Sequence, residues 1–276
     1  MNTDLKTLVL GEQALAVQDL GDGPAVVLLH GFPDSHALWR EQTAALADVG
    51  FRVIAPDLRG FGESSKPVGV ENYNILTLAS DVTGMLDALS ISKAHVVGHD
   101  WGAALAWALA AFAPERVDHL VALSVGHPSS FARAGIAQRE KSWYMLLFQF
   151  EDIAEQWLSA SDFANLRAWS GHPDIERVVA DLSRPGALTA ALNWYRANVH
   201  PRSMIAPPIT FPPIQAPTMG VWSTGDGALI EAGMTGSAAF VQGQWRYERI
   251  EGAGHWMQLD APDRVNALLL DFLPKP

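Results

Sequence analysis

Short apolar segments alternate with longer amphipathic segments through the first half of the chain. Four apolar runs bounded by Gly, Pro or Asp are typical of strands buried on both faces, and they cover residues 25–30, 52–55, 94–97 and 119–123. Apolar positions recur at helical spacing in residues 35–49, 75–89 and 101–113. This alternation predicts a parallel sheet with helices on both faces. An antiparallel hairpin is predicted at the sheet edge, over residues 7–10 and 14–20.

The alternation stops near residue 128. The next segment carries helical patterns with no strand pattern between them, over residues 143–158, 174–182 and 187–199. A proline cluster follows, which predicts an extended return connection and comprises Pro201, Pro207, Pro208, Pro212, Pro213 and Pro217. Strand patterns resume at residues 218–222 and 247–250, before a last helix over 262–272. We therefore predict a core domain of residues 1–127 and 217–276, with an inserted helical cap of residues 128–216.

Composition and charge narrow the classes of function. The chain has 276 residues, 49% of them hydrophobic, and its 19 Lys and Arg against 30 Asp and Glu give a formal net charge of −11. An acidic surface repels nucleic acid and anionic lipid, so neither is expected as a partner. The absence of cysteine excludes disulfides, thiolate metal sites and a cysteine nucleophile.

The chain shows no targeting or membrane-spanning pattern. Its longest apolar run, residues 101–113, is shorter than the roughly 20 residues that a transmembrane helix needs. Residues 1–10 lack the pattern of a signal peptide. We therefore expect a cytoplasmic protein, and both a monomer and a homodimer remain open.

The segment Gly98-His99-Asp100-Trp101-Gly102 is the sharpest candidate for catalytic chemistry. It follows a predicted strand and opens a predicted helix, which is the context of a nucleophile elbow. Small flanking residues allow a tight turn that lifts the central side chain, here Asp100, above the sheet. A carboxylate nucleophile attacks an alkyl carbon to form an ester, after which a base must activate water. An ordinary turn with Asp100 as the helix N-cap is the alternative.

The C-terminal part of the chain supplies a candidate base and a candidate acid. His255 lies on a glycine-rich loop after the last predicted strand, and Asp226 follows the strand predicted over residues 218–222. The chain order of nucleophile, acid and base matches one known arrangement of catalytic triads. Glu231 is a weaker candidate for the acid. The backbone amides of Phe32 and Trp101 are predicted to form an oxyanion hole.

Two other patterns indicate no cofactor. Gly60-Phe61-Gly62 resembles the start of a dinucleotide-binding loop, but Ser65 replaces the third glycine. His95 and His99 are four residues apart on a strand and its turn, so they are not expected to share a metal ion. We therefore predict neither a metal nor an organic cofactor.

Four segments together resemble the soluble epoxide hydrolases of the α/β-hydrolase superfamily, in the branch with an aspartate nucleophile: residues 30–102, 144–149, 193–196 and 254–256. The resemblance implies an α/β-hydrolase fold with a mostly parallel eight-stranded sheet, helices on both faces and an inserted α-helical cap. It also implies that Tyr144 and Tyr195 project from the cap and hydrogen-bond the epoxide oxygen. A phenol with a pKa of about 10 is a suitable proton donor to the alkoxide that forms when an epoxide opens.

The predicted activity is hydrolysis of a neutral, largely apolar epoxide to a vicinal diol, with detoxification as the expected role. Asp100 forms the ester, and His255, oriented by Asp226, activates water. Four aromatic residues are predicted to contact the substrate, namely Phe32, Trp101, Trp194 and Trp256.

Three alternative functions remain to be weighed. A haloalkane dehalogenase shares the aspartate nucleophile and the tryptophan after it, but such enzymes commonly carry Asn where Phe32 stands. Fluoroacetate dehalogenases carry Arg where Trp101 stands. A binding or sensor protein without turnover is the alternative from another class, and the complete set of Asp100, Asp226 and His255 argues against it.

Overall fold

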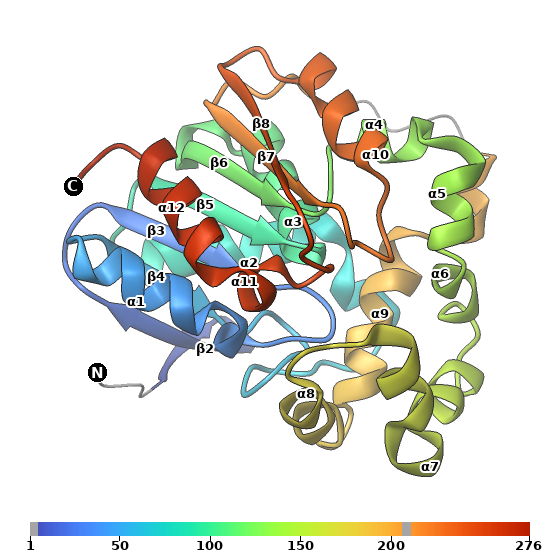
Figure 1. The fold of residues 1–276 in the computed structure, drawn as a ribbon. Helices are drawn as coiled ribbons and strands as arrows, with labels where there is room; N and C mark the ends of the chain where they lie inside the picture. Colours follow the sequence, from blue (N-terminus) through green and yellow to red (C-terminus); the bar gives the residue numbers. More distant parts are fainter. Residues whose placement is uncertain (1–4, 206–210) are drawn as a thin grey trace.

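The computed structural model describes residues 5–205 and 211–276, and an eight-stranded sheet runs through them (Figure 1). The strands are β1 (Lys6–Leu10), β2 (Gln13–Leu20), β3 (Ala25–Leu29), β4 (Arg52–Pro56), β5 (Ala94–His99), β6 (Val117–Leu123), β7 (Thr218–Ser223) and β8 (Trp245–Ile250). Their order across the sheet is β1-β2-β4-β3-β5-β6-β7-β8. Strand β2 is antiparallel to β1 and β4, and all other neighbours are parallel. The predicted mostly parallel sheet and its edge hairpin are confirmed.

Two layers of helices cover the sheet. Helices α1 (Arg40–Asp48) and α12 (Pro262–Phe272) lie on one face, and α2 (Ile75–Ala88) and α3 (Trp101–Phe112) lie on the other (Figure 1). Alternate residues of β3 divide between these layers, because Val26 and Leu28 pack with α1 and α12 while Val27 and Leu29 pack with α2 and α3. Burial on both faces explains why β3 is apolar without interruption.

The remaining elements outside the long insertion are short: η1 (His36–Trp39), η2 (Val70–Tyr73), η3 (Pro114–Arg116), α10 (Glu231–Thr235), η5 (Gly236–Phe240) and α11 (Met257–Asp260), where η denotes a 3₁₀ helix. The helix predicted over residues 35–49 therefore starts as a 3₁₀ turn and becomes α-helical at Arg40. In the described part of the chain, no helix has both the length and the apolarity needed to cross a bilayer.

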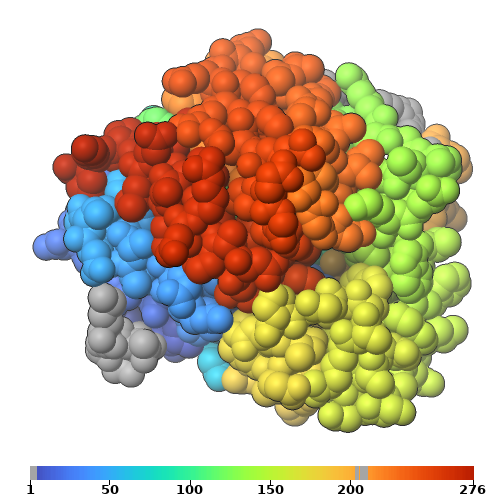
Figure 2. Space-filling model, viewed as in Figure 1, coloured from blue at the N-terminus to red at the C-terminus, as the bar shows by residue number. Residues whose placement is uncertain are grey.

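Between β6 and β7, the described residues up to 205 form helices and no strand: α4 (Pro128–Arg133), α5 (Gly135–Lys141), α6 (Tyr144–Leu147), α7 (Ile153–Ser170), α8 (Ile175–Leu182), α9 (Ala187–Asn198) and η4 (Pro201–Met204). The arrowheads of the parallel strands point toward this helical insertion (Figure 1). In the space-filling view, the insertion lies directly against the orange and red C-terminal part of the chain (Figure 2). The carboxyl edge of the sheet is thus covered by helices.

Two predictions for the insertion are wrong in detail. The single helix expected over residues 143–158 is divided between α6 and α7, because Asp152 has φ +63° and interrupts the helical backbone. Apolar spacing hides this break, since residues on both sides of it enter the same buried cluster. Pro201 begins η4 and is not part of an extended connection, while Pro207 and Pro208 lie outside the described residues.

Candidate active site

Asp100 occupies a strained turn between β5 and α3. Its backbone has φ 52° and ψ −122°, a conformation that non-glycine residues rarely adopt. The turn is so tight that a Cβ atom at Gly98 would lie 2.2 Å from the carbonyl oxygen of Gly102. A Cβ atom at Gly102 would in turn lie 2.0 Å from the carbonyl oxygen of Leu29. The two glycines therefore permit the turn that places Asp100 at the carboxyl edge of the sheet.

The loop after β3 supplies a hydrogen-bond donor to Asp100. The backbone N–H of Phe32 donates to Oδ1 of Asp100 at 2.9 Å. A Cβ atom at Gly31 would lie 2.4 Å from the same oxygen and 2.7 Å from the backbone nitrogen of Trp101. The amides of Phe32 and Trp101 therefore both lie close to the Asp100 carboxylate, which is the placement expected of an oxyanion hole.

His255 lies between two carboxylates that come from different strand ends. Its Nδ1 is 2.9 Å from Oδ2 of Asp226, and its Nε2 is 3.7 Å from Oδ2 of Asp100. Asp226 is fully buried, and its other oxygen accepts hydrogen bonds from the N–H groups of Ala228 and Leu229 at 2.8 and 2.9 Å. The carboxylate of Asp226 thus fixes the imidazole ring and directs Nε2 toward Asp100.

Charge governs the protonation of this histidine. Burial lowers the pKa of His255, but the charges and hydrogen bonds of Asp226 and Asp100 outweigh burial and raise the pKa to about 10. Burial raises the pKa of Asp226, and the opposite effects of His255 and the two backbone donors bring that pKa below its ordinary value. In the resting state His255 is therefore an imidazolium between two carboxylates.

Glu231, the other candidate for the acid, lies elsewhere. Its Oε1 accepts a hydrogen bond from the Tyr247 hydroxyl at 2.8 Å and lies 3.6 Å from Nε of Arg249. The structure therefore gives Asp226 as the carboxylate that contacts His255.

Two buried tyrosines face Asp100 from the helical insertion. Tyr144 begins α6 and Tyr195 lies in α9, with their ring centroids 6.1 Å apart. Burial raises the pKa of both phenols well above 10, and the negative charge of Asp100 raises each further. A hydrogen bond from Trp101 partly offsets this effect at Tyr195. Both phenols stay protonated at neutral pH, so they can donate protons toward the cavity.

These side chains meet around a cavity of about 360 Å³. Of the residues singled out from the sequence, those that line it are Phe32, Asp100, Tyr144, Tyr195, His255 and Trp256, and Trp143 lies beside Tyr144 in the wall. The cavity is also lined by residues that no sequence pattern indicated, among them Lys141, Trp169, Ser170, Gly171 and Asp260. Ser170 ends α7, and residues 160–163 inside α7 depart from helical backbone angles, so the apolar spacing of this helix does not indicate which side faces the site.

Two predicted substrate contacts need correction. Trp194 is fully buried and does not line the cavity, and its indole N–H donates to the carbonyl oxygen of Arg59 at 2.9 Å. Trp101 does not line it either, because its ring packs against Tyr195 with centroids 5.1 Å apart. The side chains of both tryptophans therefore support the residues at the cavity wall.

A further buried carboxylate, which no sequence pattern indicated, joins the loop after β3 to the insertion. Asp34 is fully buried and lies 3.2 Å from Nε2 of His172 and 3.1 Å from Nη2 of Arg177. It also accepts a hydrogen bond from the indole of Trp256 at 2.9 Å. Burial raises the pKa of Asp34, but the charges of His172 and Arg177 outweigh burial and hold that pKa well below its usual range. The Asp34 carboxylate thus links the helical insertion to Trp256, which follows His255 in the chain.

Known sequences resemble the chain over nearly its whole length. A family model described as alpha/beta hydrolase fold matches residues 24–262. The AB hydrolase superfamily protein YfhM of Bacillus subtilis (strain 168) is 36% identical over 265 residues, which cover 91% of each chain. Epoxide hydrolase A of Mycobacterium tuberculosis is 32% identical in an alignment of 305 positions that covers 94% of each chain.

Solved structures also resemble the fold over nearly the whole chain. One, described as novel epoxide hydrolases of the alpha/beta hydrolases superfamily from metagenomes of hot environments, has a TM-score of 0.90 at 30% identity and covers 100% of both chains. The crystal structure of Bacillus megaterium epoxide hydrolase in complex with an inhibitor has a TM-score of 0.89 at 26% identity, and it covers 97% of this chain and 99% of that one.

The buried link at Asp34 generates a prediction about stability. Asp34→Asn should lower the free energy of unfolding by about 3 kcal/mol at neutral pH, because Arg177 and His172 lose the charge that they face. The pKa of Asp34 is depressed in the native state, so its stabilisation is present above pH 3.8 and is lost as the pH falls below that value. Urea unfolding from pH 3 to 8 measures the difference between wild type and variant.

The matched control is Asp271→Asn, which removes the exposed partner of Arg246. Its effect on the free energy of unfolding should be about 0.5 kcal/mol or less. Equal losses in both variants, or a difference at Asp34 that does not shrink below pH 4, would contradict the stabilising role of the Asp34 charge.

Proposed function

The chain belongs to the epoxide hydrolase family of the α/β-hydrolase superfamily, and from this premise we propose that it hydrolyses an epoxide to a vicinal diol through a covalent ester on Asp100. One observation carries the proposal: the Asp100 carboxylate and the buried, protonated phenols of Tyr144 and Tyr195 line the same cavity. Opening an epoxide at carbon needs a nucleophile on one side and a proton donor to the departing oxygen on the other.

In the first step, Asp100 attacks an epoxide carbon. Its Oδ1 is held by the Phe32 amide, so Oδ2 is the oxygen that forms the new carbon–oxygen bond. The carbon–oxygen bond of the epoxide breaks, and the departing oxygen takes a proton from Tyr144 or Tyr195. The products are a neutral ester, a hydroxyl group and a tyrosinate.

Loss of the Asp100 charge prepares the second step. In the free enzyme that charge helps to raise the pKa of His255, so forming the ester lowers the pKa. The imidazolium of His255 then gives one proton to the tyrosinate, so both the imidazole and the phenol become neutral. His255 Nε2 can now accept a proton from water, while Asp226 continues to hold Nδ1.

The hydroxide formed in this way attacks Cγ of Asp100. Negative charge develops on Oδ1, where the N–H groups of Phe32 and Trp101 stabilise it. The bond between Cγ and the substrate-linked oxygen breaks, and the departing alkoxide takes the proton of the Cγ–OH group, so the diol leaves and the Asp100 carboxylate re-forms. Asp100 and the imidazolium of His255 are restored, so the net reaction adds one water to the epoxide.

The surroundings of the site favour an apolar substrate. We propose that residues 128–216 act as a cap over a core of residues 1–127 and 217–276, with the aromatic side chains of Trp143, Trp169 and Trp256 contacting the substrate. Such walls suit a neutral epoxide with an apolar substituent. The alternative halide chemistry has less support, because Phe32 offers no side-chain donor and the Trp101 indole hydrogen-bonds Tyr195.

A substrate panel tests the reaction. Aryl, alkyl and fatty-acid epoxides should be converted to diols, whereas haloalkanes should release halide at least about 10²-fold more slowly, since the two phenols assist only a departing oxygen. Chromatography of the diol and a halide assay measure both outcomes. Halide release that matches or exceeds diol formation would favour the dehalogenase alternative.

The proposed ester leads to a prediction about His255. His255→Gln should still be alkylated but should hydrolyse the ester about 10²–10⁴-fold more slowly, so the alkyl-enzyme accumulates as a mass adduct on Asp100. The control is Asp100→Asn, which should form no adduct. In wild type, one turnover in H₂¹⁸O should place ¹⁸O in Asp100. An unlabelled Asp100 with labelled diol would rule out the ester route.

The phenols generate a third prediction. Replacing Tyr144 and Tyr195 together by Phe should slow ring opening by about 10²–10⁴-fold, because neither proton donor remains. Tyr247→Phe, which removes a hydroxyl bonded to Glu231 outside the cavity, is the control and should leave the rate unchanged. Single-turnover ester formation measures the step. A double variant with the rate of the control would show that the phenols do not act as acids.

A further inference from the structure

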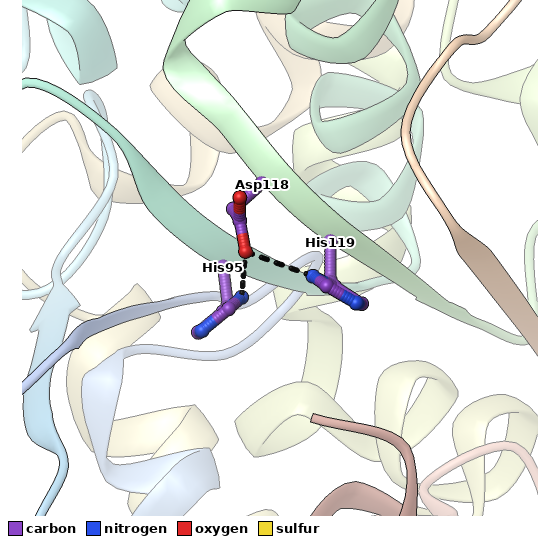
Figure 3. A group of neighbouring side chains, drawn as sticks. All are labelled: His95, Asp118 and His119. Carbon is purple, nitrogen blue, oxygen red and sulfur yellow. Dashed lines mark hydrogen bonds and ion pairs between the residues drawn. The ribbon is translucent and has the colours of Figure 1, made fainter. Parts of the chain in front are cut away.

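A second cluster of titratable side chains lies at the end of the sheet opposite to Asp100. His95 is the second residue of β5, and Asp118 and His119 are the second and third residues of β6 (Figure 3). The Asp118 Oδ2 atom lies 3.3 Å from Nδ1 of His95 and 2.9 Å from Nδ1 of His119. One ligand atom from each of the three residues lies within 4.8 Å of the other two. The Nδ1 atoms of both imidazoles thus lie within 3.3 Å of the same carboxylate oxygen.

An irregular register between β5 and β6 brings these residues together. Ala94 pairs with Val117 and Val96 pairs with Leu120, so two residues of β6 lie opposite His95. In a regular strand, adjacent side chains point to opposite faces, and Asp118 and His119 could not both face His95. A bulge redirects side chains locally, and bulges are common beside functional sites.

The Nδ1 atom of His95 lacks a hydrogen bond. The residue is 6% exposed, and within the described ranges this atom has no hydrogen-bond partner, because its contact with Asp118 does not have hydrogen-bond geometry. A buried polar atom without a partner costs free energy and needs an explanation. Beside it, a hollow of about 200 Å³ is lined by Pro24, Ala25, Lys93, Ala94, His95 and Asp118, so solvent reaches the cluster from the side of His95 and Asp118.

We propose that His95, Asp118 and His119 bind a divalent transition-metal ion, with Zn²⁺ as the natural probe, through the two Nδ1 atoms and Oδ2. Two imidazoles and a carboxylate are ligands that Zn²⁺ accepts, and ligands of one tetrahedral ion at about 2.1 Å lie about 3.4 Å apart. The 3.3 Å from His95 Nδ1 to Oδ2 matches that spacing, whereas the 2.9 Å hydrogen bond between His119 Nδ1 and Oδ2 would lengthen when an ion replaces its proton. Asp118 is partly exposed, so water can supply the fourth ligand.

Lys93 orients the Asp118 carboxylate and partly offsets its negative charge. Its Nζ lies 3.1 Å from Oδ1 of Asp118, which leaves Oδ2 for the metal ion. Lys93 is about half exposed, so solvent screens its repulsion of a cation. His99, which sequence analysis paired with His95, takes no part, since its Nε2 lies 2.9 Å from the carbonyl oxygen of His255.

The metal site is independent of the proposed hydrolysis. It joins β5 to β6 at the amino-terminal edge, whereas Asp100 follows the carboxyl end of β5. The bound ion would hold the two strands together and stabilise the native state, because the unfolded chain does not preserve the site. Chelation should leave the rate of hydrolysis unchanged.

The test is Zn²⁺ titration of the full chain after treatment with EDTA, followed by calorimetry and thermal unfolding. We expect one tight site per chain and a higher Tm with Zn²⁺. Co²⁺ should give the visible absorption of a four-coordinate site with nitrogen and oxygen ligands. His119 is the more exposed of the two histidines, and His119→Gln should weaken Zn²⁺ binding by more than about 100-fold, beyond the loss caused by altering a residue that only orients a ligand.

The matched control is His36→Gln. His36 also pairs with a carboxylate, Asp57, but no third ligand group is grouped with that pair among the described residues. This variant should bind Zn²⁺ like wild type. The metal-free Tm of each variant shows whether it has folded. Unchanged Zn²⁺ affinity in folded His119→Gln, or equal losses in both variants, would overturn the site.

Discussion

The close approach of the β3 loop to the turn at Asp100 is the constraint on which the site depends. Gly102 lies against the carbonyl oxygen of Leu29, and Gly31 lies against the Asp100 carboxylate, so neither position has room for a Cβ atom. The contact fixes the Phe32 amide relative to the Asp100 carboxylate before any substrate binds. Because β3 and β5 are adjacent parallel strands, their carboxyl ends meet at one edge, and the sheet itself provides this preorganisation.

Buried charge connects this edge to the rest of the molecule. Asp100 and Asp226 flank the imidazolium of His255, and Asp34 faces His172 and Arg177 from the insertion. Each buried carboxylate therefore has a cationic or hydrogen-bonding partner, as burial in a low dielectric requires. Trp256 lies between the two groups, since its indole donates to Asp34 and it follows His255 in the chain. The position of the insertion and the orientation of His255 are thus coupled.

The sequence predicts the positions of functional residues that directly follow strands better than the positions of residues that an irregular backbone places. Strand periodicity located the ends of β5, β7 and β8, and the structure brings Asp100, Asp226 and His255 together there. The break inside α7 and the bulge in β6 leave no periodic signal in the sequence. The cavity residues at the end of α7 and the cluster around Asp118 could therefore not be predicted. Trp194 was misjudged because neighbours in sequence on a helix point to different sides.

The two oxygens of the Asp100 carboxylate are chemically distinct, because the Phe32 amide holds only Oδ1. In an ester mechanism, each turnover transfers the other oxygen to the product and replaces it from water. If the hydrogen bond persists through the cycle and prevents rotation of the carboxylate, the enzyme keeps one original oxygen indefinitely. After many turnovers in isotopic water, the side chain would carry a single heavy oxygen, and its isotopic composition would record how rigidly the backbone of the β3 loop is held.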